Sequence, residues 1–159
     1  MAAQLTQEQI ALFNDPETHK VLATLDESGA PHVVFKQSLY VSEEGNIHYL
    51  ELLESSRSNH NLVRAIWFDR KVSIVVKGGD RQSFQVKGQP VEVHISGTMF
   101  QKHYVEIQER LGDVDLAGVW VIEPQEVINE NFWIRKADEE AKHPLFRHLD
   151  RIAKTEKHQ

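Results

Sequence analysis

Short segments rich in β-branched and aromatic residues, each bounded by turn residues, constrain the fold of this chain more than any other feature. Turn signals that contain glycine separate the first three segments, as expected of antiparallel neighbours in a meander. Pro124 interrupts the last segment, which can therefore form one strand or two, so the total is six or seven. The segments are residues 20–25, 31–41, 47–52, 71–77, 81–96 and 118–136.

Helical patterns are fewer and lie between these segments. The candidate helices are residues 5–14, 56–68 and 98–112, with a last one that begins near Pro144. Because strands and helices do not alternate strictly, the order predicts a mainly β chain: an antiparallel barrel with peripheral helices. The long segment 81–96 is expected to bulge at Gly88 and Pro90. The length fits a single domain over residues 1–159, with a charged helical tail from about residue 138.

Composition excludes several classes of function. The chain has no cysteine, which excludes disulfides and cysteine nucleophiles, and its net charge of −6 argues against a nucleic-acid binder. Its histidines lack the spacing of metal ligands, so we expect no metal site. No apolar run approaches the roughly 20 residues that span a bilayer, and residues 1–13 lack the basic region followed by an apolar stretch that is typical of a secretion signal. We therefore expect a cytoplasmic protein that binds neither membranes nor nucleic acids.

A polar run at residues 54–60 lies between a strand and a helix. Ser55, Ser56, Arg57 and Ser58 stand where the first amides of that helix lack partners and the helix dipole is positive. Hydroxyl groups and a guanidinium at such a point suit a phosphate monoester. The alternative is that Ser55 or Ser56 only caps the helix and that Arg57 lies in solvent.

Two adjacent aromatic residues near the C-terminus form a second candidate site. Phe132 and Trp133 fall in a predicted strand, in which alternation sends them to opposite faces. One could enter the core, and the other would then face a dimer interface or a planar ligand. The alternative is that both pack in the core across a bent strand.

Five segments in a fixed order resemble a known family. KVLATLDESGAPHVVF, GNIHYLEL, SSRSNHNL, RKVSIVV and RQSFQVKGQPVEV are similar to the pyridoxamine 5'-phosphate oxidase-like family of FMN-binding split barrels, from about Lys20 to Trp133. The resemblance implies a six-stranded antiparallel split barrel that forms a homodimer, with FMN at the subunit interface. It also implies a flavin-dependent oxidoreductase that acts on a small-molecule substrate or electron donor.

The resemblance also implies a set of cofactor-binding residues. They come from the second and third predicted strands, the polar run, an arginine–glutamine pair and the aromatic segment. They are His32, Val33, Val34, Tyr49, Leu50, Glu51, Ser56, Arg57, Ser58, Gln82 and Trp133. No catalytic residue can be assigned: His32, Tyr49 and His60 are the available proton donors, and each is more readily explained as structural.

This chain departs from the oxidases at the expected phosphate clamp. His32 replaces an arginine and Ser58 replaces a lysine, although Lys36 is near enough on the strand to substitute for one of them. Residues 134–137 do not match the arginine–histidine–arginine pattern that recognises pyridoxal phosphate. We therefore expect a flavoprotein that is not a true pyridoxamine phosphate oxidase. A non-catalytic flavin-binding or sensor module, a haem- or deazaflavin-binding protein, and a barrel without a cofactor remain alternatives.

Overall fold

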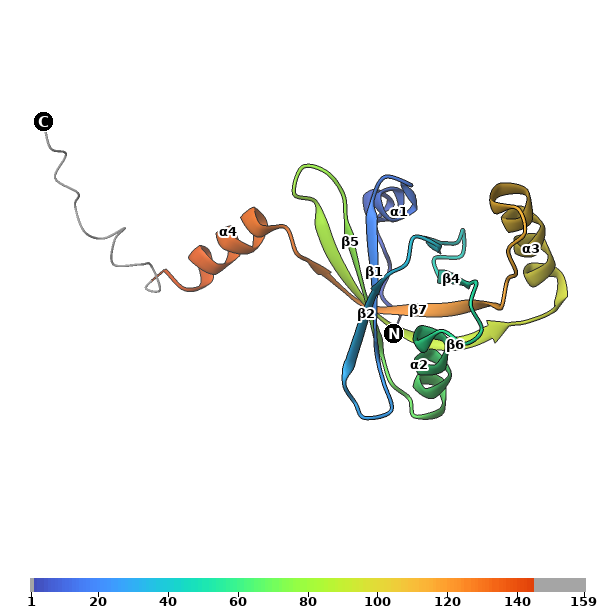
Figure 1. Cartoon of the computed structure of the whole chain (residues 1–159). Helices are drawn as coiled ribbons and strands as arrows, with labels where there is room; N and C mark the ends of the chain where they lie inside the picture. Colours follow the sequence, from blue (N-terminus) through green and yellow to red (C-terminus); the bar gives the residue numbers. More distant parts are fainter. Residues whose placement is uncertain (1, 145–159) are drawn as a thin grey trace, which may run out of the picture.

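The structure, a computed structural model, describes residues 2–144 and contains one antiparallel sheet of seven strands in the order β2-β1-β5-β6-β7-β4-β3. The strands are β1 (His19–Leu25), β2 (Pro31–Phe35), β3 (Leu39–Val41), β4 (Ile47–Glu51), β5 (Val72–Lys77), β6 (Ser83–His94) and β7 (Gly118–Asn129). The helices are α1 (Gln7–Asn14), α2 (Arg57–Trp67), α3 (Gly97–Leu111) and α4 (Phe132–Lys142). The sheet curls into a half-barrel with α1, α2 and α3 beside it and α4 at one end, so the predicted mainly β split barrel is confirmed (Figure 1).

The segment 31–41 is not one strand, as predicted, but two strands at opposite edges of the sheet. β2 pairs with β1, and β3 pairs with β4, so the expected three-stranded meander is wrong. The three residues between them cross the open side of the barrel. Gln37 fixes this crossing, because its side chain accepts from the Lys20 amide and donates to the Thr18 carbonyl. The Lys20 ammonium, buried nearby, donates to the carbonyls of Phe13 and Leu39.

The two longest strands, β6 and β7, bend the sheet. Their register shifts between Lys87 and Gly88 and again between Pro90 and Glu92, which confirms the predicted bulges. A side chain at Gly88 would place its Cβ 2.5 Å from Ile122 Cγ2, so glycine is required by close approach. The bulges increase the local twist and let the sheet curl around its core.

The curled sheet separates two hydrophobic cores. The larger lies inside the curl and contains Phe13 of α1, Leu62 of α2 and Trp120 of β7. The smaller lies between the outer face of the sheet and α3, around Leu50 and Ile107. β4 borders both cores and is buried along its whole length. Its side chains are consequently divided between the two sides of the sheet, which positions the candidate site.

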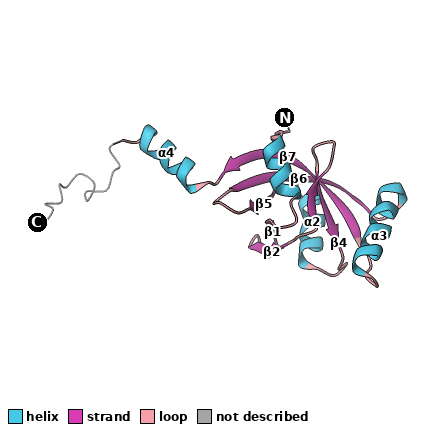
Figure 2. Ribbon diagram, turned by 90° about the horizontal axis from the view of Figure 1, so that it is seen from above, coloured by secondary structure: helices cyan, strands magenta, loops and turns pink. Residues whose placement is uncertain are grey.

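The predicted strand through Phe132 and Trp133 is wrong, because both residues lie in the first turn of α4. Asn131 caps that helix by accepting a hydrogen bond from the Trp133 amide. Phe132 and Trp133 are 62% and 49% exposed, so neither enters the core. Figure 1 shows α4 projecting from the barrel, and Figure 2 places α3 and α4 at opposite ends of the molecule. The predicted helix near Pro144 falls almost wholly outside the described residues.

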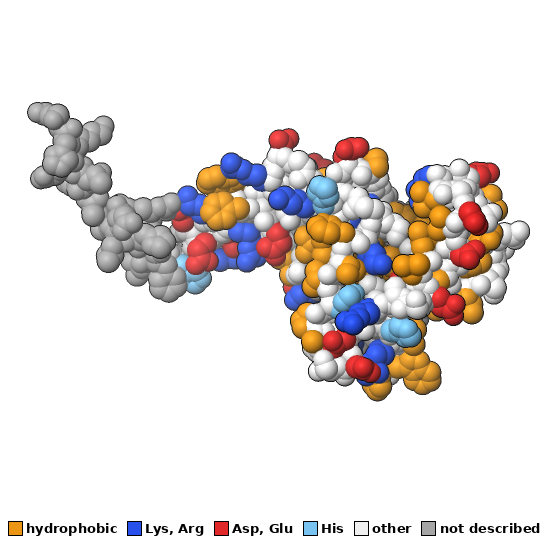
Figure 3. Space-filling model, viewed as in Figure 1, with side chains coloured by type: hydrophobic (Ala, Val, Ile, Leu, Met, Phe, Trp, Pro, Cys, Tyr) orange, Lys and Arg blue, Asp and Glu red, His pale blue; other side chains and the backbone are white. Residues whose placement is uncertain are grey.

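Basic side chains cover the exposed ring of Trp133. The Arg81 guanidinium lies 5.1 Å from the ring centroid, and the Lys136 ammonium lies 5.4 Å from it. In Figure 3, hydrophobic and basic side chains lie next to each other over the start of α4. Within residues 2–144, no helix is both long enough and apolar enough to cross a bilayer.

Candidate functional site

A cavity of about 980 Å³ opens beside the β2–β3 crossing, between the end of β4 and one face of α3. Its position follows from the crossing: β3 pairs with β4 only as far as Tyr49, which leaves Leu50 and Glu51 beyond the end of β3 on that side. Aromatic, apolar and charged side chains contribute to its wall. The lining residues include Phe35, Lys36, Tyr40, Tyr49, Glu51, Lys102, His103, Glu106 and Arg110.

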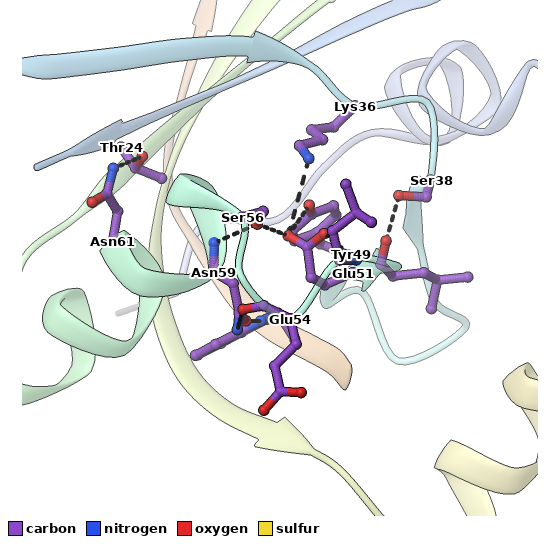
Figure 4. A network of polar contacts seen from close by, with 12 residues as sticks. Thr24, Lys36, Ser38, Tyr49, Glu51, Glu54, Ser56, Asn59 and Asn61 are labelled. Carbon is purple, nitrogen blue, oxygen red and sulfur yellow. Dashed lines mark hydrogen bonds and ion pairs between the residues drawn. The ribbon is translucent and has the colours of Figure 1, made fainter. Parts of the chain in front are cut away.

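Glu51 is the centre of a polar network at the end of β4 (Figure 4). Although its side chain is only 2% exposed, its carboxylate has several partners. One oxygen accepts hydrogen bonds from the Tyr49 hydroxyl and, at 2.6 Å, from the Ser56 hydroxyl; the other accepts from the Leu53 amide at 3.0 Å. The Lys36 ammonium lies 4.0 Å from the first oxygen. A buried carboxylate is tolerated here because donors surround it.

Tyr49 remains a hydrogen-bond donor in this network. Burial and the hydrogen bond to Glu51 raise the pKa of Tyr49 far above its usual range, so the hydroxyl stays protonated at neutral pH. The Lys36 ammonium lies 5.4 Å from the centroid of the Tyr49 ring. The cavity wall therefore combines an aromatic face with a nearby positive charge.

Ser56 and its neighbours occupy the predicted polar run. Ser56 is the cap of α2: its hydroxyl accepts from the Asn59 amide at 3.0 Å and gives its only proton to Glu51. Arg57 is exposed in the first turn of α2, whereas Ser58 is buried at 2% exposure. The structure thus agrees with the cap alternative, with Ser56 as the cap and Arg57 exposed; Arg57 does not line the cavity in the single chain.

The remaining predicted cofactor residues do not line the cavity in the single chain. His32, Val33 and Val34 lie on the edge strand β2, next to Phe35, which does line it. Gln82, just before β6, and Trp133, on α4, are both exposed. Among the predicted residues, the structure brings Tyr49, Leu50 and Glu51 into the cavity wall and places Ser56 against Glu51.

A second polar network was not predicted from the sequence. The Tyr40 hydroxyl lies 2.7 Å from His48 Nδ1 and 2.7 Å from His103 Nε2, and His103 Nδ1 lies 3.2 Å from Glu106 Oε2. Burial and the charge of Glu106 raise the pKa of Tyr40 to about 12. Burial, with a smaller effect of His103, lowers the pKa of His48. Tyr40 and His48 lie opposite each other across the β3–β4 hairpin. The turn residues at 43–46 could have predicted this pairing from the sequence.

No group of three or more histidine or acidic side chains that could hold a metal ion occurs among residues 2–144. Positive charge is nevertheless present on the cavity wall. Lys102 and Arg110 lie on the same face of α3 as His103 and Glu106, and Lys36 lies at the crossing. The cavity can therefore hold a partly apolar, partly anionic small molecule.

Neither a protein-family model nor a curated relative matches the sequence, but solved structures match the fold. HupZ from Group A Streptococcus has a TM-score of 0.66 at 20% identity, covering 81% of this chain and 96% of HupZ. A putative pyridoxamine 5'-phosphate oxidase from Lactobacillus delbrueckii has a TM-score of 0.63 at 25% identity, covering 79% and 93%.

Two further solved structures that match the fold are of proteins named for a cofactor. An FMN-binding protein from Syntrophomonas wolfei has a TM-score of 0.59 at 14% identity, covering 76% of this chain and 82% of its own. The heme storage protein HutZ from Vibrio cholerae has a TM-score of 0.55 at 16% identity, covering 80% and 95%. At these identities the likenesses show the fold, and proteins of this fold differ in the cofactor they are named for.

Proposed function

We propose that this chain, whose fold is that of the pyridoxamine 5'-phosphate oxidase-like split-barrel family, binds FMN and acts as a flavin-dependent oxidoreductase on a small molecule. The observation that carries the proposal is the cavity beside β4, which combines aromatic side chains with cations. Its volume of about 980 Å³ is at the upper end of the range typical of small-molecule sites. The FMN-binding protein from Syntrophomonas wolfei, which has this fold, supports the choice of cofactor.

The residues present fit a flavin in most respects. Phe35 and Tyr49 offer aromatic surface to a planar ring, and Lys36 offers a positive charge beside it. Ser56 does not fit as a hydrogen-bond donor to the phosphate, because its hydroxyl already donates to Glu51 and accepts from the Asn59 amide. We therefore assign the phosphate to Arg57 and to the first amides of α2.

When bound, the flavin would supply two-electron redox chemistry, and the chain would supply binding and electrostatics. Arg57 would neutralise phosphate charge at the start of α2. Glu51 would hold Tyr49 and Ser56 in place and so keep the cavity wall and the cap of α2 aligned. Lys36 would stabilise negative charge that develops on the ligand.

We also propose that two copies of the chain close the site. Val33 and Phe35 expose 59% and 71% of their surface on edge strand β2, and α4 exposes Phe132 and Trp133. Large exposed apolar side chains near a binding site are typical of an interface. A monomer by sedimentation at micromolar concentration, in the presence of FMN, would contradict this part of the proposal.

Arg57→Ala is the test of the phosphate assignment. The variant should bind FMN about 10-fold or more weakly, because a charge-assisted hydrogen bond is lost, and should bind riboflavin as the wild type does. Lys71→Ala, which removes an exposed cation before β5, is the matched control and should change neither affinity. Equal weakening of FMN and riboflavin would contradict the phosphate role. A protein that ignores added FMN would refute the proposed function, and turnover with a reduced nicotinamide separates an enzyme from a binding module.

Haem is the second candidate, because the heme storage protein HutZ has this fold and His103 lines the cavity. Both ring nitrogens of His103 already have partners, Tyr40 and Glu106, so iron ligation would require that network to open. This favours the flavin. The visible spectrum of the purified protein decides between them, since a Soret band indicates haem and flavin absorbs at distinct wavelengths.

A further inference from the structure

Glu106, His103, Tyr40 and His48 form one continuous hydrogen-bonded chain that runs inward from the cavity wall. Glu106 is the outer end, with 55% of its side chain exposed, and His48 is the inner end, with 4% exposed. Tyr40, His103 and Glu106 line the cavity, and His48 lies behind them. The network therefore connects the ligand space to a buried imidazole.

The network can hold a positive charge on His103 with every hydrogen bond made. An imidazolium donates from both ring nitrogens: here Nδ1 donates to Glu106, and Nε2 donates to the Tyr40 oxygen. The Tyr40 hydroxyl then donates to Nδ1 of His48, which is neutral and carries its proton on Nε2. In this state the charge of His103 faces a carboxylate.

When His103 is neutral, the hydrogen bonds that Tyr40 makes with His103 and His48 run in the opposite direction. Because the Glu106 carboxylate can only accept, neutral His103 keeps its proton on Nδ1. Its bare Nε2 must then accept from the Tyr40 hydroxyl, and the Tyr40 oxygen must accept from Nδ1–H of His48. At equilibrium, His48 consequently carries its proton on Nε2 beside a charged His103 and on Nδ1 beside a neutral His103.

Their surroundings keep Tyr40 and His48 uncharged at neutral pH. Glu44 of the β3–β4 turn and Glu92 and His94 of β6 act electrostatically on His48, but burial dominates and lowers the pKa of His48. Burial and Glu106 keep the Tyr40 hydroxyl protonated at neutral pH. Of the network, the Glu106 carboxylate is the exposed end that can exchange protons with water.

We propose that His103, together with Glu106, is the acid–base group of this cavity, and that Tyr40 and His48 are positioning residues that fix its proton. The ligand it serves is a planar conjugated carbonyl compound of the quinone class, which suits a cavity whose wall combines aromatic and basic side chains. This inference rests on the proposed flavin-dependent reaction, which supplies the electrons.

The proton transfer balances with a hydride transfer. A quinone would accept a hydride from the reduced flavin, which is thereby oxidised, and the quinone oxygen left with negative charge would take a proton that Glu106 has received from His103. Glu106 would in turn take up the Nδ1 proton of His103, so one N–H bond breaks and one O–H bond forms. His103 is then transiently neutral, with its remaining proton on Nε2 and still donated to Tyr40. Water then restores the proton through the exposed carboxylate of Glu106. General acid catalysis of this kind contributes about 100-fold to 10,000-fold in rate.

Nitrogen NMR of the ¹⁵N-labelled histidine rings in the ligand-free chain of residues 1–159 tests the coupling without any cofactor. We expect the proton of His48 to move from Nε2 to Nδ1 over the pH interval in which His103 loses its charge. Tyr40→Phe keeps both rings but removes the hydroxyl, and should leave His48 in one tautomer throughout. A wild-type His48 that keeps one tautomer while His103 titrates would overturn the positioning role.

Rapid mixing of the reduced, flavin-loaded protein with 1,4-benzoquinone tests the acid–base role. His103→Gln and Glu106→Gln should each slow reoxidation by about 100-fold and flatten its pH profile, with flavin affinity unchanged. Glu109→Gln, on the exposed side of α3 and not at the cavity, is the matched control and should keep the wild-type rate. Wild-type rates and pH profiles in both variants would overturn the acid–base role. If no flavin binds, the proposed function fails and this role with it, while the NMR result still decides whether the rings are coupled.

Discussion

Replacement of Ser56 by alanine would test whether Glu51 holds the end of β4 to the start of α2. The change removes one of the donors to a carboxylate that is 2% exposed, and it removes the cap of α2. A hydrogen bond to a charged group contributes about 1.5–3 kcal/mol, and a serine cap contributes about 1 kcal/mol. We therefore expect the free energy of unfolding to fall by about 3 kcal/mol.

Urea denaturation at pH 7 measures this loss, and calorimetry should show a Tm lowered by roughly 6–12 °C, at about 2–4 °C per kcal/mol for a chain of this size. Ser55→Ala, one residue earlier and exposed, is the matched control and should change stability by less than about 0.5 kcal/mol.

Tyr49→Phe adds a second test of the same carboxylate. It removes only the hydroxyl that donates to Glu51, so we expect a loss of about 2 kcal/mol. The double variant should differ from the sum of the two single variants by more than about 0.5 kcal/mol, because both hydroxyls serve one oxygen. The reasoning is refuted if Ser56→Ala is as stable as Ser55→Ala, or if the two losses simply add.

Two further predictions concern the bulge and the buried histidine. Gly88→Ala should destabilise the fold by about 1–3 kcal/mol, because its Cβ would lie 2.5 Å from Ile122 Cγ2. Thermal melts measure the loss, and Gly79→Ala, whose Cβ would have nothing within 4 Å, is the control. Equal stability of the two variants would contradict the prediction. Because the pKa of His48 is lowered in the folded state, His48 becomes protonated near pH 6.5 in the unfolded chain and only at a lower pH in the folded protein. The free energy of unfolding should therefore fall as the pH drops from about 7 to 5, and His48→Gln should flatten that slope in urea titrations at several pH values; an unchanged slope would count against it.

The sequence predicted the strand segments and most helices because their apolar periodicity and turns are local. The bulges at Gly88 and Pro90 and the cap at Ser56 were predictable for the same reason. The separation of β2 from β3 was not, because residues 31–41 read as one continuous extended run, and only pairing with distant strands divides it. The strand predicted through Phe132 and Trp133 was wrong, because aromatic residues favour strands and the helix cap at Asn131 was not recognised.

In the candidate site, too, contacts between residues that are close in the sequence were predictable and contacts between distant residues were not. Tyr49 and Glu51 were named from the family resemblance, and the structure places both in the cavity wall. Their hydrogen bond could have been suspected, because residues two apart on a strand share a face. His103 could not have been joined to Tyr40 from the sequence, since 63 residues separate them and only the packing of α3 brings them together.

The strand order also determines when the cavity can form during synthesis of the chain. β4 carries Tyr49 and Glu51, yet its partners in the sheet are the short β3 and the late strand β7. A two-stranded hairpin alone is at best marginally stable in water. The β1–β2 hairpin and β5 can pair early, whereas the cavity wall must wait until residues 118–129 have left the ribosome. A nascent chain that ends before β7 would therefore expose β4 to the wrong partners and could not hold a ligand.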